Sequence, residues 1–411
     1  MAVASNASVV QVGVEPQTTA MFDIVTSVMF ASAAGFLIFI LAVILLILGL
    51  YWYYYVRGAA YAPKTVHYTT QSDDEEVVTK KRGDSIAQAS KGLGHPAVHH
   101  YPSHLSPVPV SPHIDIAAGH LLLTYIEDNL KSGNKLQEEW KLLQEYTPED
   151  VSTTAATLPE SKLKNRYPDA LPYDHTRVKL SVPDNETGTD YINASFIRDG
   201  DPTRPRYIVT QGPLVNTVSD FWQMVWEQDV SVIVMLTTLS EMGMAQCSQY
   251  WPSSGVSQYH IYEVRLVSEH EASDAYVIRS LFLRNMQTQQ SRTVTHFQYH
   301  AWPSSQVPQP ALSLLEFRRK VNKAHAQQQS PLLIHCNGGI GRSGAYCLID
   351  MALNRIASGA KEINLAATVE YLRDQRPNMV RTKAQFEFAL AALIQETHAM
   401  LDAARQRAAS F

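Results

Sequence analysis

The sequence predicts an α/β domain built around one central sheet, preceded by a single membrane-spanning helix. From about residue 114 to residue 401, strand-like runs such as VSVIVML and SPLLIHC alternate with helical patterns such as ALSLLEFRRKVNKAHA and INLAATVEYLRDQ. This alternation is typical of α/β folds. Nearer the N-terminus, residues 24–56 contain no charged side chain, and such a segment is long enough to cross a bilayer with some tilt.

Composition narrows the class of protein further. The 411 residues carry a formal net charge of -5, and this acidic balance argues against nucleic acid as a partner. Three cysteines, Cys247, Cys336 and Cys347, do not make a disulfide framework, so we expect them to lie in a reducing compartment. We also expect no cofactor and no metal site, because the histidines near residue 100 lack the fixed spacing of metal ligands.

The flanks of the apolar segment predict its orientation. Lys and Arg residues follow the segment, beginning with Arg57 and Lys64, and none precedes it. Because positive charge is retained in the cytosol, residues 1–23 are expected to form a short luminal or extracellular segment. A cleaved signal peptide fits less well, since the apolar run is too long. Residues 57–112 are rich in Ser, Pro, His and Gly and are predicted to form a disordered cytosolic linker.

An amphipathic helix is predicted at the start of the folded domain. In IDIAAGHLLLTYIEDNL, the residues expected on one broad apolar face are Ile116, Leu123, Tyr125, Ile126 and Leu130. The domain is expected to span residues 113–404, with a tail over residues 405–411. Its length suffices for one large hydrophobic core, and no internal repeat divides it.

The stretch PLLIHCNGGIGRSGAYCLIDMAL combines a buried strand, a glycine-rich loop and the start of an apolar helix. Such a loop is an anion cradle, because backbone N–H groups and a helix N-terminus converge on it. A phosphate monoester fits there, with Arg342 closing over it. Arg342 and the helix dipole would favour a thiolate at Cys336, a nucleophile, and Ser343 could hydrogen-bond its sulfur.

The residues expected to bind phosphate are Asn337, Gly338, Gly339, Ile340, Gly341 and Arg342. A buried structural cysteine is the alternative interpretation of a Cys followed six positions later by an Arg. The full string H-C-x-x-G-x-G-R-S-G favours the phosphate loop.

This string resembles the signature of the protein tyrosine phosphatases. Further stretches match motifs of that family in the expected order: KNRYPDALPYDHTRVKL, DYINASFI, TQGPLVNTVSDFWQMVWE and CSQYWP. The resemblance covers residues 120–400 and implies a central twisted mixed sheet flanked by helices. In the recognition loop, it implies that Tyr167 stacks on a substrate ring and that Asp169 holds the peptide backbone.

More specifically, DIAAGHLLLTYIEDNL, RNMQTQQSRTVTHF, LLEFRRKVNK and KEINLAATVEYLRDQRP resemble the receptor-type phosphatase-like N group, the insulinoma-associated islet autoantigens and phogrin. The resemblance implies a location in dense-core secretory vesicles and the plasma membrane, and a role in regulated secretion. That group normally carries a long luminal region, whereas only about twenty residues precede the apolar segment here. A short isoform or an incomplete gene model would account for this departure.

A second departure concerns the general acid. WPSSQVP aligns with the family's mobile W-P-D loop, whose Asp protonates the leaving tyrosine oxygen, so Ser304 stands at the position of the acid. A hydroxyl is too weak an acid for this step, and loss of a general acid costs a factor of about 10²–10⁴ in rate. Between residues 275 and 349 the only acidic residue is Glu316, in a predicted helix, and His300 is expected to end a strand.

Other positions also lack the residues that support turnover in the family. The family's glutamine that positions hydrolytic water corresponds to Arg381, which leaves Gln385, and the lysines of its E-loop correspond to Met242 and Gln246. Arg381 could instead add positive charge beside the cradle. The N group often has Asp where this chain has Gly338, so the cradle lacks that like-charge penalty.

We therefore interpret the chain as a single-pass membrane pseudophosphatase that binds phosphotyrosine proteins or phosphoinositides rather than turning them over. Two alternatives stay open. The first is a slow phosphatase that uses a Cys336 thiolate. The second is a scaffold with an empty loop that forms homodimers or pairs with related phosphatases.

Overall fold

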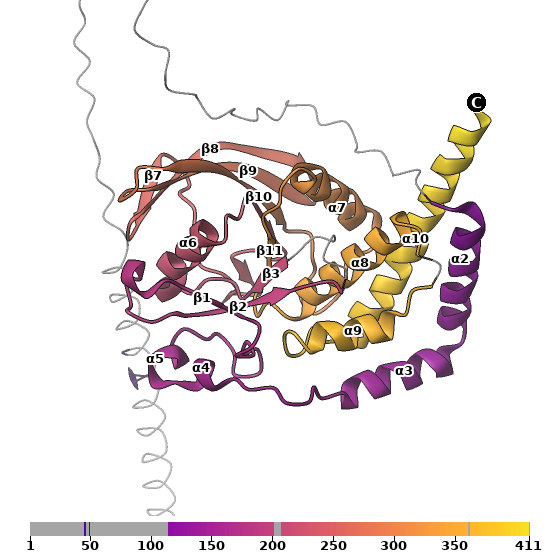
Figure 1. The fold of residues 1–411 in the computed structure, drawn as a ribbon, viewed down its shortest axis with the longest axis horizontal. Helices are drawn as coiled ribbons and strands as arrows, with labels where there is room; N and C mark the ends of the chain where they lie inside the picture. The colour runs from indigo at the N-terminus through magenta and orange to yellow at the C-terminus, as the bar shows by residue number, and fades with distance from the viewer. Residues whose placement is uncertain (1–44, 47–48, 50–113, 201–206, 361, 411) are drawn as a thin grey trace, which may run out of the picture. The chain divides into compact units, whose positions relative to one another are not determined.

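The computed structural model describes residues 114–200, 207–360 and 362–410, and also Leu45, Leu46 and Gly49, which are helical (Figure 1). The predicted outer segment, membrane span and linker otherwise lie outside the described residues. Within the part of the chain that is described, no helix is long and apolar enough to cross a membrane.

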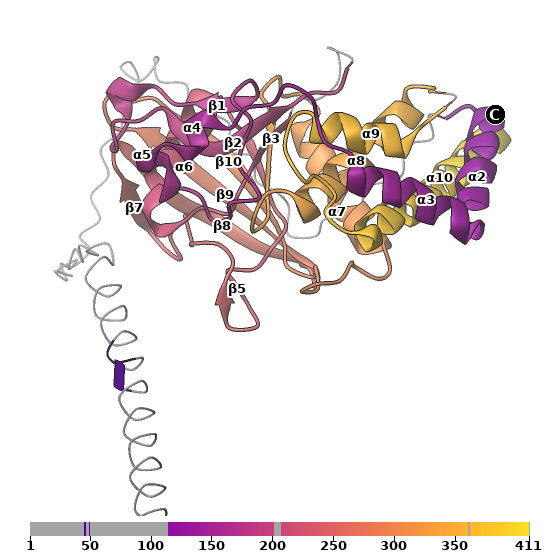
Figure 2. The ribbon, with the colours of Figure 1, turned by 90° about the horizontal axis from the view of Figure 1, so that it is seen from below.

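Nine strands of the described chain form one mixed sheet in the order β1-β2-β3-β11-β4-β10-β9-β8-β7. The four central strands, β3, β11, β4 and β10, are parallel to their neighbours within this group, and the outer pairs are antiparallel. The strands are β1 (Arg177–Lys179), β2 (Tyr191–Ile197), β3 (Tyr207–Thr210), β4 (Val232–Met235), β7 (Val256–Tyr259), β8 (Tyr262–Ser273), β9 (Tyr276–Asn285), β10 (Ser291–Tyr299) and β11 (Leu332–His335). A separate hairpin, β5 (Ser240–Glu241) and β6 (Met244–Ala245), projects from the sheet (Figure 2).

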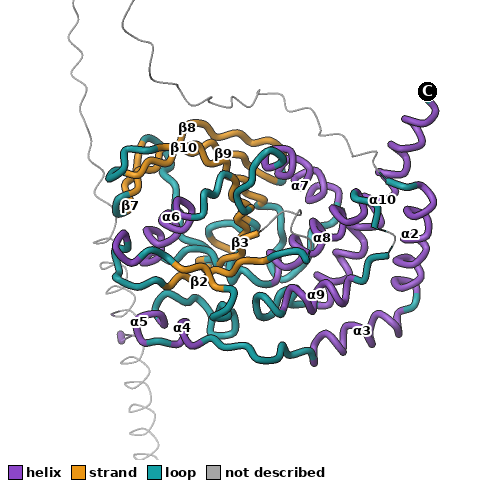
Figure 3. Tube along the Cα trace, in the orientation of Figure 1, coloured by secondary structure: helices purple, strands orange, loops and turns teal. Residues whose placement is uncertain are grey.

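Helices cover both faces of the central strands. The helices of the described chain are α2 (Ile116–Lys131), α3 (Gly133–Glu145), α4 (Thr154–Thr157), α5 (Pro159–Lys162), α6 (Val218–Glu227), α7 (Leu312–His325), α8 (Gly341–Ala357), α9 (Leu365–Arg373), α10 (Lys383–Ala409), and the 3-10 turns η1 (Val182–Asp184) and η2 (Val215–Thr217). Figure 3 shows α7, α8, α9 and α10 gathered together, with α6 apart from them. Because successive side chains of a strand point to opposite faces, Val232 and Val234 of β4 join one core cluster, and Ile233 and Met235 join the cluster that contains α6. The predicted α/β architecture with a mixed sheet is confirmed.

The helix predicted at the start of the domain is present as α2, but its buried face differs in part from the prediction. Leu122, Leu123 and Ile126 are buried, whereas Ile116 and Tyr125 are exposed. The reason is that α2 packs mainly against α10, and a single neighbouring helix covers a narrower stripe than a sheet does. At the other end, α10 continues to Ala409 and so passes the predicted domain end at residue 404.

A chain of buried polar side chains crosses the core beneath β11. Tyr250 Oη lies 2.7 Å from His335 Nε2 and 2.8 Å from His296 Nε2, and His335 Nδ1 lies 3.2 Å from the carbonyl oxygen of Cys336. At the far end, Arg279 Nη1 lies 3.3 Å from His296 Nδ1. A guanidinium only donates and a carbonyl only accepts, so every bond in this chain has one direction, from Arg279 to the Cys336 carbonyl.

Both histidines are neutral in the folded protein. Burial lowers the pKa of His335 to about 4, and burial together with the charge of Arg279 lowers the pKa of His296 well below its ordinary range. The hydrogen-bond direction assigns the tautomers: His335 carries its proton on Nδ1, and His296 carries its proton on Nε2.

Stability should therefore fall as the pH falls from about 6.5 toward 4. The unfolded histidines bind protons first, so stability is fully present above their unfolded pKa and is lost as the pH approaches the folded pKa. Each histidine contributes up to about 1.4 kcal/mol per pH unit in this window. Denaturant unfolding should be measured between pH 7 and pH 5. The free energy of unfolding should change less steeply with pH for His335→Gln than for the unaltered protein. The exposed His175→Gln is the matched control, and an unchanged slope for His335→Gln would contradict the prediction.

Candidate active site

The loop over residues 336–342 lies between β11 and α8 and forms the floor of the candidate site. Cys336, 4% exposed, follows the last residue of β11, and α8 begins at Gly341. Gly339 has φ +66, and a Cβ atom there would lie 2.2 Å from the carbonyl oxygen of Thr210. Only glycine fits this position, because it combines a left-handed backbone with a close approach to β3.

Donors outside the loop hold three successive carbonyl groups of it. The N–H of Gly212 donates to Asn337 O at 2.8 Å, and the fully buried guanidinium of Arg376 donates to Gly338 O at 3.2 Å and to Gly339 O at 2.8 Å. The N–H and C=O groups of one trans peptide point in opposite directions. The N–H groups that follow these carbonyls are therefore free to face an anion on the other side.

The guanidinium of Arg342 is held by a carboxylate from the β5–β6 hairpin. Its Nη1 and Nη2 lie 2.5 and 2.8 Å from the two oxygens of Glu241, and both side chains are largely buried. A second contact joins the hairpin to the loop, because Asn337 Nδ2 donates to Gln246 Oε1. The hairpin thus fixes the cation over the loop in a planar, bidentate arrangement.

Ser304 lies beside this ion pair. The preceding carbonyl, of Pro303, lies 3.4 Å from Arg342 Nη2. Burial alone would raise the pKa of Glu241, but hydrogen bonds and charge from Arg342, with hydroxyl hydrogen bonds from Thr237 and Ser304, hold that pKa below its ordinary value. The carboxylate of Glu241 is therefore ionised at neutral pH and has no proton to give.

The two other candidates for a proton donor have the expected places in the fold. Glu316 lies on α7, and His300 comes directly after the end of β10, where its N–H donates to Ala275 O at 3.0 Å.

The predicted ligand-contacting residues border the loop on two sides. The ring of Tyr167 lies 3.3 Å from the place that a Cβ atom would occupy on Gly338, and the amide of Gln385 lies 2.9 Å from the corresponding place on Gly341. Gln385 Oε1 also accepts the N–H of Arg381 at 2.9 Å, because Gln385 closes the capping box of α10.

Arg381 and Asp169 contact each other, which the sequence did not predict. Arg381 Nη2 lies 2.8 Å from Asp169 Oδ2. The residue before Arg381, Val380, is buried and has φ +57. Its backbone is bound at both ends, because its N–H donates to Ile340 O at 3.3 Å and its carbonyl accepts from Arg373 Nη2 at 2.9 Å.

Ser343 is fully buried at the start of α8, and its hydroxyl has no hydrogen-bond partner among the described residues. The hydrogen bond to the Cys336 sulfur that the sequence predicted is thus not formed. The three cysteines are free. Burial raises the pKa of Cys247 to about 12 and that of Cys347 well above its ordinary value, so neither is a thiolate at neutral pH.

Sequence reasoning missed two residues of the site, Arg376 and Glu241. Arg376 stands in the quoted stretch KEINLAATVEYLRDQRP but was given no role, since no periodicity distinguishes a fully buried arginine from an exposed one. Glu241 could not be identified from the sequence, because it lies on a hairpin more than sixty positions before Ser304 in the chain.

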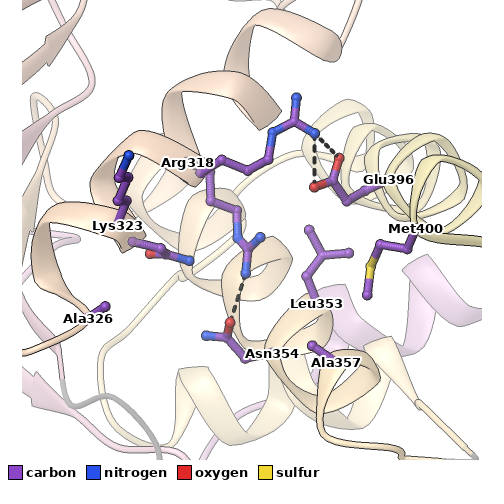
Figure 4. Close-up of a pocket in the computed structure, with 10 residues that line it drawn as sticks. Arg318, Lys323, Ala326, Leu353, Asn354, Ala357, Glu396 and Met400 are labelled. Atoms are coloured by element: carbon purple, nitrogen blue, oxygen red, sulfur yellow. Dashed lines mark hydrogen bonds and ion pairs between the residues drawn. The ribbon is translucent and has the colours of Figure 1, made fainter. Parts of the chain in front are cut away.

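A pocket of ≈ 300 Å³ lies elsewhere, between α7, α8 and α10 (Figure 4). Several of its polar side chains bind one another: Arg319 donates to both oxygens of Glu396, at 2.9 and 3.2 Å, and Arg318 donates to Asn354 at 2.8 Å. These internal pairs support a structural role for the pocket.

Comparison with known proteins agrees with the geometry. The profile of the protein-tyrosine phosphatase family matches residues 161–395. The chain is 52% identical over 299 residues to receptor-type tyrosine-protein phosphatase-like N of Mus musculus, covering 72% of this chain and 30% of that protein. It is 51% identical over 311 residues to receptor-type tyrosine-protein phosphatase N2 of Mus musculus (76% and 31%), and 50% identical over 298 residues to the N protein of Homo sapiens (72% and 30%).

The chain thus spans about a third of the length of these relatives. The match to the family profile extends over more than half of the chain and includes the loop over residues 336–342. The chain belongs to the protein-tyrosine phosphatase family, in the group of the receptor-type N and N2 proteins.

Proposed function

We propose that the domain is a pseudophosphatase, which binds phosphate monoesters in the loop over residues 336–342 rather than turning them over. The observation that carries the proposal is that Ser304 stands at the acid's position, where the preceding carbonyl and the carboxylate of Glu241 are both bound by Arg342. A leaving phenolate needs a proton at this position. Ser304 offers a weakly acidic hydroxyl, and Glu241 is kept ionised by Arg342.

Three retained features support binding. Arg342 is held in a planar arrangement over the loop, and the carbonyl groups of Asn337, Gly338 and Gly339 are bound on the outer side. The hydroxyl of Ser343 is buried without a partner among the described residues. Buried polar groups rarely stay unpaired, so this hydroxyl supports an occupant in or next to the loop.

We further propose that residues 24–56 anchor the chain in the membrane of secretory, dense-core vesicles, with the phosphatase-like domain in the cytosol. The apolar segment and its basic C-terminal flank support the anchoring and the orientation. Resemblance to the N group supports the vesicle location and a role in regulated secretion.

A slow phosphatase is the second candidate function, because Cys336 and Arg342 are both retained at the loop. Its substrate would be a phosphotyrosine protein or a phosphoinositide. A scaffold that forms homodimers or pairs with a related phosphatase is the third, and it requires no occupant in the loop.

Oxyanion binding should depend on Arg342. Calorimetry with orthovanadate should detect binding to the unaltered protein. Arg342→Ala should weaken it by about a hundredfold or more, because the positive charge at the loop and its charge-assisted hydrogen bonding to the oxyanion are lost. Arg265→Gln, an exposed arginine on β8, is the control and should bind as the unaltered protein does. Absence of oxyanion binding in the unaltered protein would favour the scaffold.

Ser304→Asp should restore part of the missing activity. We expect hydrolysis of phosphotyrosine peptides by the unaltered protein to be at least about a hundredfold slower than by a family member that retains the acid. An Asp at 304 would lie beside the ionised Glu241, and this like charge raises the pKa of the new acid toward the range useful for proton donation. Quenched-flow measurements should then show faster phenol release and an accumulating phosphocysteine, with full turnover requiring Arg381→Gln as well.

The control for this experiment is Ser305→Asp, which adds the same charge one residue away, at an exposed position with φ +61 that Asp tolerates. It should not speed phenol release. Ordinary turnover by the unaltered protein, or equal gains from the two Asp variants, would end the pseudophosphatase proposal.

The orientation can be tested by protease protection. In sealed vesicles with the cytosolic face outward, a C-terminal epitope should be digested by added protease and an N-terminal epitope should be protected. Detergent should remove the protection. The opposite pattern would overturn the orientation.

A further inference from the structure

Arg279, on β9, lies where two branches of hydrogen bonds toward the candidate site begin. The residue is 8% exposed, its guanidinium carbon lies 4.6 Å from the ring centroid of Trp251, and its Nε lies 2.5 Å from Glu269 Oε2 on β8. Two further contacts come from Nη1, which carries two N–H groups. Nη1 lies 3.3 Å from His296 Nδ1 and 2.8 Å from Gln298 Oε1. One nitrogen thus supplies a donor to each branch.

The first branch ends on the backbone of the phosphate loop. It is the hydrogen-bond chain described above, from Arg279 to the carbonyl oxygen of Cys336. The same peptide unit carries the N–H of Asn337, and the N–H and C=O groups of one trans peptide point in opposite directions. A donor on this carbonyl therefore fixes the direction of the Asn337 N–H and strengthens it as a donor, because hydrogen bonds in a chain polarise one another.

The second branch ends at the ion pair that holds Arg342. Gln298 Nε2 donates to the carbonyl oxygen of Thr237 at 3.1 Å, and the hydroxyl of Thr237 donates to Glu241 Oε1 at 2.9 Å. Glu241 in turn binds both terminal nitrogens of Arg342. Because the amide oxygen of Gln298 accepts from Arg279, its NH₂ group must face Thr237. Arg279 therefore determines which way this amide is turned.

We propose that Arg279 is a positioning residue for oxyanion binding, which acts on the phosphate loop and on Arg342 at the same time. This inference rests on the proposed binding function and adds a residue outside the loop and outside the β5–β6 hairpin. In the first branch, Arg279 supplies a charged donor, which is stronger than a neutral one. In the second branch, it fixes the orientation of the Gln298 amide.

The guanidinium group is required for this double role. Its planar fork holds Glu269 through one nitrogen while another nitrogen serves two acceptors. A lysine ammonium group is a compact charge without this fork. A lysine at position 279 could keep the charge and bind one or two of these partners, but it could not direct both branches.

The test measures orthovanadate binding to the whole chain by calorimetry, at a temperature where circular dichroism shows every variant to be folded. Arg279→Met should weaken binding by about tenfold, because each branch loses its first hydrogen bond. Arg279→Lys should restore part of the affinity. The matched control is Arg284→Met, on the same strand, whose guanidinium donates to Gln289 in the β9–β10 turn. This control should bind orthovanadate as the unaltered protein does.

A double variant tests the route through Gln298. Gln298→Met alone should weaken orthovanadate binding by about threefold, because one of the two branches is interrupted. Added to Arg279→Met, it should cause little further loss, since residues that act through one another are not additive. Losses that simply add would overturn the second branch.

NMR of the imidazole N–H protons tests the first branch independently of binding. The proton on His335 Nδ1 donates to the Cys336 carbonyl, and such a proton resonates further downfield when its hydrogen bond is stronger. Arg279→Met should move this resonance upfield, whereas Gln298→Met and Arg284→Met should leave it in place. A role for Arg279 in packing alone would not produce this pattern.

The outcomes separate this inference from the proposed function. If the unaltered protein binds no orthovanadate, the proposed function fails, while the resonance of His335 still tests the first branch. If orthovanadate binds and Arg279→Met leaves its affinity unchanged, the role of Arg279 is overturned. Equal weakening by Arg284→Met would assign the loss to a general disturbance of β9 and would overturn it as well.

Discussion

The candidate site depends on one buried cation, the guanidinium of Arg376. It holds the carbonyl oxygens of Gly338 and Gly339 and also the side chains of Asn193 and Ser195 on β2. Burial lowers its pKa only to about 10, so the side chain stays charged. A buried charge with this many hydrogen bonds is tolerated, and here it binds the backbone of the loop to β2.

Two polar arrangements meet at the loop and differ in charge: the hydrogen-bond chain from Arg279 to the Cys336 carbonyl, and the ion pair between Arg342 and Glu241. The first chain is neutral at both histidines and ends on the backbone. The second is charged and ends on the side chain that would contact a ligand. Both arrangements are present at the loop, while position 304 carries a serine.

Much of the fold could be predicted from the sequence because long apolar periodicities determine it. The strands VSVIVML and SPLLIHC lie at the centre of the sheet as β4 and β11, and the phosphate loop follows β11 as its glycine spacing predicts. The contacts of Glu241 with Arg342 and of Arg381 with Asp169 could not be predicted. They join segments far apart in the chain through exposed or half-buried side chains, and neither periodicity nor spacing encodes such pairing.

The backbone of Val380 determines where the exposed residue 381 lies. A β-branched residue in the left-handed region is strained, and its backbone stays there because Ile340, Arg373 and the close approach of Gly344 surround it: a Cβ atom on Gly344 would lie 2.3 Å from Val380 N. The core therefore determines where the next residue emerges, whatever its side chain. Position 381 is exposed, so its side chain can be exchanged at little cost to folding while its backbone stays in place.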